Sequence, residues 1–130
     1  MHLQGFTVGQ IGPIINHVTR HGADPDQSRY TYSNEAIDAA RTAENYAISA
    51  TPDPAAFIAG RVEAVDRKPR KNSNLLSSIV VTLPKNDLLE GREREFFEAV
   101  AALLSERVGV ENVIGGYVHL DESQPHMHFL

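Results

Sequence analysis

The chain of 130 residues contains no cysteine. Disulfide bridges are therefore excluded as a source of stability, and so are the thiolate ligands that commonly close structural zinc sites. Any metal site in this protein has to be built from histidine, aspartate and glutamate. The absence of cysteine also fits a reducing compartment, so we expect a cytoplasmic protein.

Long apolar segments are absent as well. The sequence has no run of about eighteen apolar residues, and its first residues lack the basic and apolar regions of a signal peptide. It therefore predicts neither a membrane span nor a membrane partner. With 42% apolar and 22% charged residues, the composition is typical of one globular domain.

A net basic charge is also missing, because 17 acidic residues outnumber 12 basic ones and give a formal net charge of −5. This balance argues against a protein that coats nucleic acid non-specifically. A local basic site is not excluded. Residues 61–71 could meet a phosphate backbone through Arg61, Arg67, Lys68, Arg70 and Lys71, although a solvated loop explains them equally well.

Histidine, in contrast, is concentrated in one short segment. Residues 119–128 hold three of the six histidines together with Asp121 and Glu122. Neutral imidazoles and carboxylates bind divalent cations, and the alternation of His126 and His128 places both rings on one face of a strand. Three imidazoles and one carboxylate leave a coordination position open for water or substrate. Asp121 is the more doubtful carboxylate, because it could instead orient a histidine.

The apolar pattern predicts a mixture of strands and helices. Residues 75–83 are β-rich and indicate a central strand, and residues 87–108 carry an apolar stripe that indicates a long helix ended by Gly109. Residues 3–20 are interpreted as extended and residues 21–33 as an exposed loop. A short helix over residues 35–41, capped by Ser33 or Asn34, and a second from Pro54 to about Val65 complete the prediction.

The histidine segment is expected to form a hairpin. Residues 113–119 and 125–130 alternate as two strands around a polar turn. If this turn folds the strands back on each other, His119 approaches His126 and His128. The cluster then becomes a single site.

This segment resembles the third motif of the Pre/Mob family of plasmid mobilisation and recombination proteins, the MobV-type relaxases. That motif reads His-x-Asp-Glu-x-x-Pro-His-x-His, and residues 119–128 match every fixed position. The resemblance implies an α+β fold in which an antiparallel sheet carries the metal on central strands, with helices packed on one face. It also implies that the metal ligands are His119, Glu122, His126 and His128, and that the ion is Mn²⁺ or Mg²⁺, with Zn²⁺ also possible.

The activity implied by the resemblance is metal-dependent nicking and rejoining of one DNA strand at a plasmid origin of transfer. The partner would be single-stranded or hairpin origin DNA. Residues 1–130 would form one relaxase catalytic domain, and we expect the native chain to continue beyond Leu130, with a possible homodimer formed by regions outside this sequence.

The first half of the chain resembles the family more loosely. His17 and Arg20 fit a His-x-x-Arg motif, and residues 33–37 and 41–46 resemble its Ser-Asn and Arg-x-x-x-Asn-Tyr segments. We expect His17 to attack the scissile phosphate and Arg20 to stabilise its charge, while Arg41 is either a DNA contact or a surface charge. The alternative nucleophiles are His21 and the tyrosines that precede the metal motif, Tyr30, Tyr32 and Tyr46, whereas a structural role is expected for Tyr117.

Two other classes of function remain open. A metal-dependent hydrolase or phosphoesterase would use the same cluster to activate water, without a protein nucleophile. A protein that binds origin DNA without cutting it is the third possibility. A covalent DNA adduct distinguishes the relaxase from both.

Overall fold

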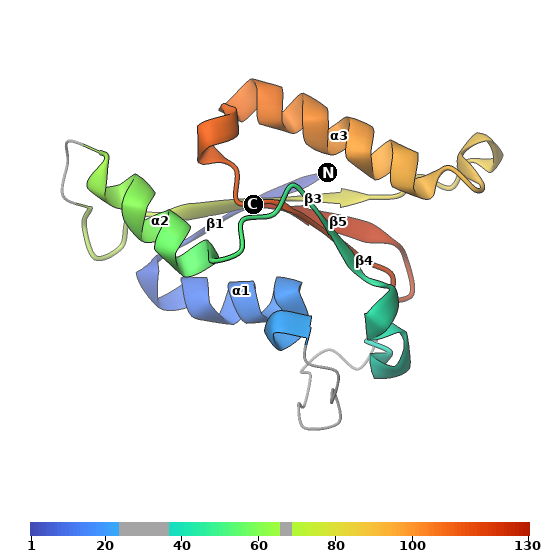
Figure 1. Ribbon diagram of the computed structural model, residues 1–130, viewed down its shortest axis with the longest axis horizontal. Helices are drawn as coiled ribbons and strands as arrows, with labels where there is room; N and C mark the ends of the chain where they lie inside the picture. Colours follow the sequence, from blue (N-terminus) through green and yellow to red (C-terminus); the bar gives the residue numbers. More distant parts are fainter. Residues whose placement is uncertain (24–36, 66–68) are drawn as a thin grey trace.

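An antiparallel sheet of five strands in the order β1-β3-β5-β4-β2 organises the protein, as seen in a computed structural model that describes residues 1–23, 37–65 and 69–130 (Figure 1). The strands are β1 (His2–Phe6), β2 (Tyr46–Ile48), β3 (Leu76–Thr82), β4 (Gly116–His119) and β5 (His126–Phe129). The α+β class with an antiparallel sheet is confirmed. β3 lies between β1 and β5, so the interior strand expected from residues 75–83 is confirmed too.

Helices cover both faces of the sheet, not one as expected. The helix α1 (Val8–Ala23) lies on one side and α3 (Glu93–Val108) on the other, while α2 (Pro54–Glu63) lies toward one end (Figure 1). Each face has its own core, because neighbouring residues of a strand point to opposite sides. Val18 and Ile58 pack with Phe6, Leu76 and Tyr117 on the α1 side, and Phe97 packs with Val81, Val118 and Met127 on the α3 side.

The extended structure predicted for residues 3–20 is wrong beyond Phe6, because α1 begins at Val8. Ile11, Ile14, Ile15 and Val18 follow the spacing of a helical stripe, and these four residues face the core. The proline and glycines in the segment concealed that pattern. Pro13 lies inside the helix, where it removes one backbone hydrogen bond without ending it.

The other predicted helices differ mainly in their bounds. The helix from Pro54 is confirmed, with Asp53 as its N-cap. The segment near residues 35–41 is instead a 3₁₀ helix, η2 (Ala39–Glu44), capped by Asp38. The long helix begins at Glu93 and not near Asp87, because Gly91 takes a positive φ of 75° between it and the short 3₁₀ helix η3 (Asp87–Leu89). Another 3₁₀ helix, η4 (Val110–Asn112), follows Gly109.

The hairpin of β4 and β5 is confirmed and forms the middle of the sheet. His119 pairs with His126, and Tyr117 pairs with His128. β5 also pairs with β3, so it is hydrogen-bonded on both sides. None of the helices in the described ranges combines the length and apolar character that a bilayer crossing requires.

Candidate metal centre

Four histidine rings gather where α1 ends against the central hairpin. The rings of His119, His126 and His128 have centroids 4.9–5.2 Å apart. His17 comes from α1, and its ring centroid lies 5.6 Å from that of His119 and 5.3 Å from that of His128. The structure therefore brings the predicted nucleophile and the predicted ligands into one cluster.

Backbone carbonyl groups fix which nitrogen of two histidines is free. A carbonyl can only accept, so a ring nitrogen at hydrogen-bond distance from it has to donate. His119 Nε2 lies 2.9 Å from Val18 O, and His126 Nδ1 lies 2.9 Å from Gln124 O. When these imidazoles are neutral, the lone pairs are on His119 Nδ1 and His126 Nε2.

Both of these lone pairs face the same carboxylate oxygen. Glu122 Oε2 lies 3.5 Å from His119 Nδ1 and 3.2 Å from His126 Nε2. Acceptors facing one another at such distances repel unless a proton or a cation stands between them. The three residues therefore fit a divalent cation, which would convert this repulsion into coordination.

Unpartnered nitrogens give a second sign of a cation site. Among the described residues, His119 Nδ1 and both ring nitrogens of His128 are buried without a hydrogen-bond partner. Buried polar atoms normally have partners, so these are candidates for metal ligation. They belong to residues that the histidine motif predicts as ligands.

The potential ligand atoms fall into two overlapping groups. His119, Glu122 and His126 form one, and His17, His119 and His128 form the other, with the atoms of each group within 4.8 Å of one another. His119 is common to both. The four predicted ligands are therefore close together, but His128 groups with His17 and not with Glu122.

Arg20 is held in place by carboxylates and does not project into solvent. Its Nε and Nη2 each donate to Asp121 at 2.9 Å, and Nη2 also donates to Glu122 at 3.0 Å. Nη1 donates to the backbone oxygen of His17 at 2.6 Å and lies 3.4 Å from His17 Nδ1. The residue is 1% exposed and has a φ of 48°, which is uncommon for a residue other than glycine. This geometry favours a positioning role over the direct phosphate contact expected for Arg20.

Asp121 accepts two of the hydrogen bonds from Arg20 and is completely buried. Its Oδ2 also accepts a hydrogen bond from Thr42 Oγ1 at 2.8 Å. Burial alone would raise its pKa, but hydrogen bonds from Arg20 and Thr42 outweigh that effect and hold the pKa of Asp121 well below its usual range. It therefore orients an arginine, and not a histidine as the sequence suggested.

The environment keeps the buried imidazoles neutral. Burial, reinforced by Arg20 and His119, lowers the pKa of His17 to about 4, and burial with the neighbouring histidines lowers the pKa of His128 to about 3. Contact with His119 lowers the pKa of Glu122 to about 2, although burial opposes the shift. At neutral pH His17 and His128 are therefore unprotonated and Glu122 is ionised, which is the state in which such groups bind metal.

The tyrosines that the structure describes are not at the histidine cluster. Tyr46 pairs with Val118 and packs in the α3-side core, on the face opposite His119, with Arg94 over its ring at 4.4 Å. Tyr117 shares the face of His119 but is a buried core residue whose pKa is raised by burial. Tyr30 and Tyr32 lie outside the described residues, as does the side chain of His21.

The predicted DNA-binding residues are dispersed. Arg41 is exposed on η2 and pairs with Glu44 at 2.9 Å. Arg70 and Lys71 are exposed in the turn before β3, toward the end of the sheet opposite His126. Arg67 and Lys68 lie outside the described residues.

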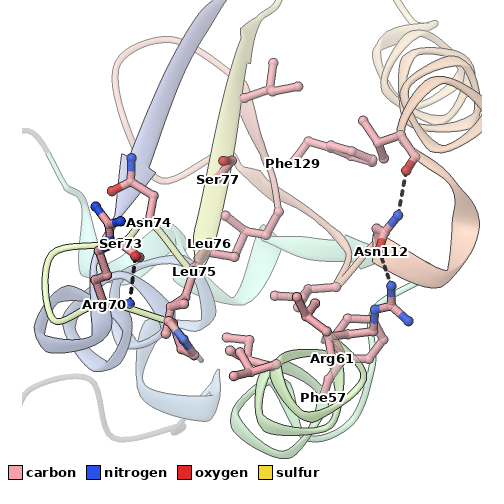
Figure 2. A pocket seen from close by; sticks show the side chains of 18 residues that line it. Phe57, Arg61, Arg70, Ser73, Asn74, Leu75, Leu76, Ser77, Asn112 and Phe129 are labelled. Atoms are coloured by element: carbon pink, nitrogen blue, oxygen red, sulfur yellow. Dashed lines mark hydrogen bonds between the residues drawn. The ribbon is translucent and has the colours of Figure 1, made fainter. Parts of the chain in front are cut away.

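A cavity of about 850 Å³ adjoins Arg70, but it has none of the chemistry of the histidine cluster. Phe57, Leu76 and Phe129 line it with apolar surface between α2 and the sheet (Figure 2). Arg61 donates to Asn112 at its edge, at 2.8 Å. The pocket lacks histidine and carboxylate groups among its lining residues, so the candidate site is the histidine cluster.

Sequence reasoning missed Thr42. Threonine is an ordinary helix-surface residue in isolation, and only the fold shows that its hydroxyl reaches Asp121. The sequence indicates Asn45 only as part of a segment that resembles the family. Its Oδ1 accepts from the backbone N–H of Leu120 at 2.7 Å, which ties the start of β2 to the turn that carries Asp121.

The clustered histidines on the central hairpin of an antiparallel sheet place this chain in a class of α+β domains that carry a metal site on the sheet. The chain matches the profile of the plasmid recombination enzyme family, Mob_Pre, over residues 6–130 and belongs to that family. It is 30% identical to a plasmid recombination enzyme of Bacillus thuringiensis over 98% of this chain, and 34% identical to plasmid recombination enzyme type 2 of Staphylococcus aureus over 78%. The family predicted from the histidine motif is confirmed.

Solved structures show the same fold. The MobM relaxase domain, bound to Mn and to origin-of-transfer DNA of plasmid pMV158 at pH 6.8, has a TM-score of 0.80 and 27% identity, covering 98% of this chain and 66% of that one. A form crystallised at pH 4.6 gives a TM-score of 0.76. This chain spans 28% and 26% of the two curated relatives, or about a quarter of their length.

Proposed function

We propose that this domain nicks and rejoins one DNA strand at a plasmid origin of transfer. The observation that carries the proposal is the contact of one carboxylate oxygen, on Glu122, with the lone-pair nitrogens of His119 and His126. The similarity to a relaxase domain bound to Mn and origin DNA supports the same activity. Residues 1–130 would then be the catalytic domain of a longer enzyme.

In this proposal His119, Glu122, His126 and His128 hold the cation, either Mn²⁺ or Mg²⁺. Bound there, the ion would withdraw charge from a non-bridging phosphate oxygen of the DNA. The chain contributes a carboxylate fixed by Arg20 and imidazoles whose free nitrogens are set by backbone carbonyls. This preorganisation reduces the rearrangement needed when DNA binds.

His17 is the proposed nucleophile. Its imidazole is held neutral by burial, so a nitrogen lone pair is available to attack phosphorus in line with the leaving oxygen. A nitrogen–phosphorus bond forms while the bond from phosphorus to the 3′ oxygen breaks. The 3′ oxygen takes up a proton, the imidazole ring loses one, and the 5′ phosphate stays on the protein, so the reverse reaction can rejoin the strand.

The remaining residues have supporting roles in the proposal. Arg20 positions His17 and Glu122, since its donors are committed to Asp121, Glu122 and the His17 backbone. Arg41, Arg67, Lys68, Arg70 and Lys71 would contact DNA. We also propose a cytoplasmic location and a homodimer formed through regions outside this sequence.

A covalent-adduct assay tests this function. The protein, with Mn²⁺, is incubated with labelled single-stranded DNA, in one reaction carrying the pMV158 origin sequence and in another a randomised pool. We expect a protein–DNA adduct that is lost in acid, because a phosphoramidate is acid-labile, and that is absent from His17→Ala and His126→Ala.

Each other outcome identifies a different function. An acid-stable adduct would identify a tyrosine, and not His17, as the nucleophile. Cleavage without any adduct would indicate a water-activating hydrolase. Binding without cleavage, unchanged in His126→Ala, would indicate a DNA-binding protein and overturn the proposed activity.

A further inference from the structure

The two overlapping ligand groups raise the question of what His17 does before DNA arrives. His17 offers a nitrogen within 4.8 Å of those of His119 and His128, as close a group as the one formed by His119, Glu122 and His126. Small rotations of these rings would bring the three nitrogens around one ion.

The partners of His128 point the same way. Both of its ring nitrogens are buried without a hydrogen bond, and the ring lies 5.3 Å from that of His17. Its potential ligand atom groups with His17 and not with Glu122. An ion bound through His128 is therefore within reach of His17.

The charge of the cluster suits a dication even though Arg20 is close to His17. The one positive charge of Arg20 is opposed by the carboxylates of Asp121 and Glu122, at 2.9 and 3.0 Å. The side-chain charges of Arg20, Asp121 and Glu122 sum to −1. The guanidinium is also tied to the His17 backbone oxygen at 2.6 Å, so its 3.4 Å contact with the ring is secondary.

We propose that His17, with His119 and His128, ligates the cation in the DNA-free protein and is displaced from it by a DNA phosphate. A lone pair bound to a cation cannot attack phosphorus, so this ligation would keep the protein from reacting before DNA is in place. A phosphate oxygen is a harder ligand than an imidazole and competes well for Mn²⁺ or Mg²⁺. The ligation rests on the geometry alone, whereas its meaning as a safeguard rests on the proposed function.

The test measures metal binding by the 130-residue chain without DNA. Mn²⁺ affinity is determined by calorimetry, and the number of bound imidazole nitrogens by electron spin-echo spectroscopy, for the natural chain, His17→Ala and His2→Ala. His2 is the matched control because it is exposed on the edge strand β1, with β3 between it and β5. Circular dichroism confirms that each variant is folded.

We expect His17→Ala to lose one bound imidazole and to weaken Mn²⁺ binding at least about tenfold, since loss of an outer-shell partner alone costs about 10–100-fold. His2→Ala should match the natural chain. Adding the pMV158 origin oligonucleotide to the natural chain should also remove one imidazole.

An unchanged imidazole count in His17→Ala overturns the proposal, even if affinity falls, because His17 would then act only on the shape of the site. If His17→Ala does not fold, His17→Gln takes its place and an unchanged count there overturns the proposal, because a count of three in the natural chain alone would equally fit His119, His126 and His128. Because the ligand count is measured without DNA, it is independent of whether the protein nicks. If no adduct forms but the natural chain has one more bound imidazole than His17→Ala, the proposed function is rejected and ligation by His17 stands.

Discussion

Arg20 and Asp121 lie 101 positions apart in the sequence and form a two-point salt bridge that is almost completely excluded from solvent. One comes from α1 and the other from the turn between β4 and β5. The pair ties the helix that carries His17 to the hairpin that carries the other three histidines of the cluster. The cluster therefore depends on this contact as well as on the sheet.

Breaking this pair should destabilise the fold strongly. Asp121→Asn removes the charge opposite a buried guanidinium, and loss of one partner of a buried ion pair costs about 3–5 kcal/mol. We expect about 3 kcal/mol, because Glu122 still faces Arg20. Urea unfolding measures the change. Glu95→Gln, at an exposed pair with Arg92, should leave the unfolding midpoint unchanged.

Acid should destabilise the metal-free protein in two stages. The lowered pKa values of His17 and His128 mean that the unfolded chain takes up protons first as pH falls below about 6.5, so stability decreases from there toward pH 4 and 3. Glu122, whose pKa is lowered to about 2, stabilises the fold above pH 4.5 and loses this effect as pH falls toward 2.

Urea midpoints at pH 7.5, 6.5, 5.5 and 4.5 test this order. In His128→Asn the decline between pH 6.5 and 4.5 should be shallower than in the natural chain. A flat profile over that interval in the natural chain would contradict the assignment of neutral, buried imidazoles.

Metal should stabilise the protein through the histidine cluster. A ligand at about 100 times its Kd adds about 2.7 kcal/mol to the free energy of unfolding if it binds only the folded state. Thermal unfolding with Mn²⁺ should show this increase and its reversal by EDTA. His119→Ala should abolish the increase, because His119 belongs to both groups of potential ligand atoms, whereas His2→Ala should retain it. An equal Mn²⁺ effect in His119→Ala would place the ion elsewhere.

Thr42 should affect the reaction rate through Asp121. Thr42→Val keeps the shape but removes the hydroxyl that donates to Asp121 Oδ2, so Arg20 is held less firmly. We expect nicking to slow about tenfold, equivalent to about 1.4 kcal/mol, with little change in DNA affinity. Thr42→Ser should restore the rate. If serine fails to restore it, the methyl packing of Thr42 matters and not its hydrogen bond.

The ligand cluster was predictable because its spacing is local. His119, His126 and His128 belong to one hairpin, so their approach follows from strand alternation and a turn. Arg20 was found as a motif residue, but its role was not, since the partner that commits its guanidinium is more than a hundred positions away. Thr42 had no signal of its own.

The error over α1 has a different physical cause. Its apolar stripe has helical spacing, but Pro13 and the glycines at positions 9 and 12 weigh against a helix in isolation. Packing of Val18 and its neighbours against the sheet outweighs that local preference. The β3 prediction succeeded because a dense β-branched run has the same preference locally and in the core.

The sheet order has a consequence for how the protein is made. Among the described strands of the sheet β5 comes last in sequence, yet it lies at the centre of the sheet and carries two of the clustered histidines. While a ribosome has made only the first four strands, β1 with β3 and β4 with β2 remain separate pairs. Neither the continuous five-stranded sheet nor the complete histidine cluster can exist at that stage. The growing polypeptide can therefore complete its histidine cluster only after the other strands of the sheet have been synthesised.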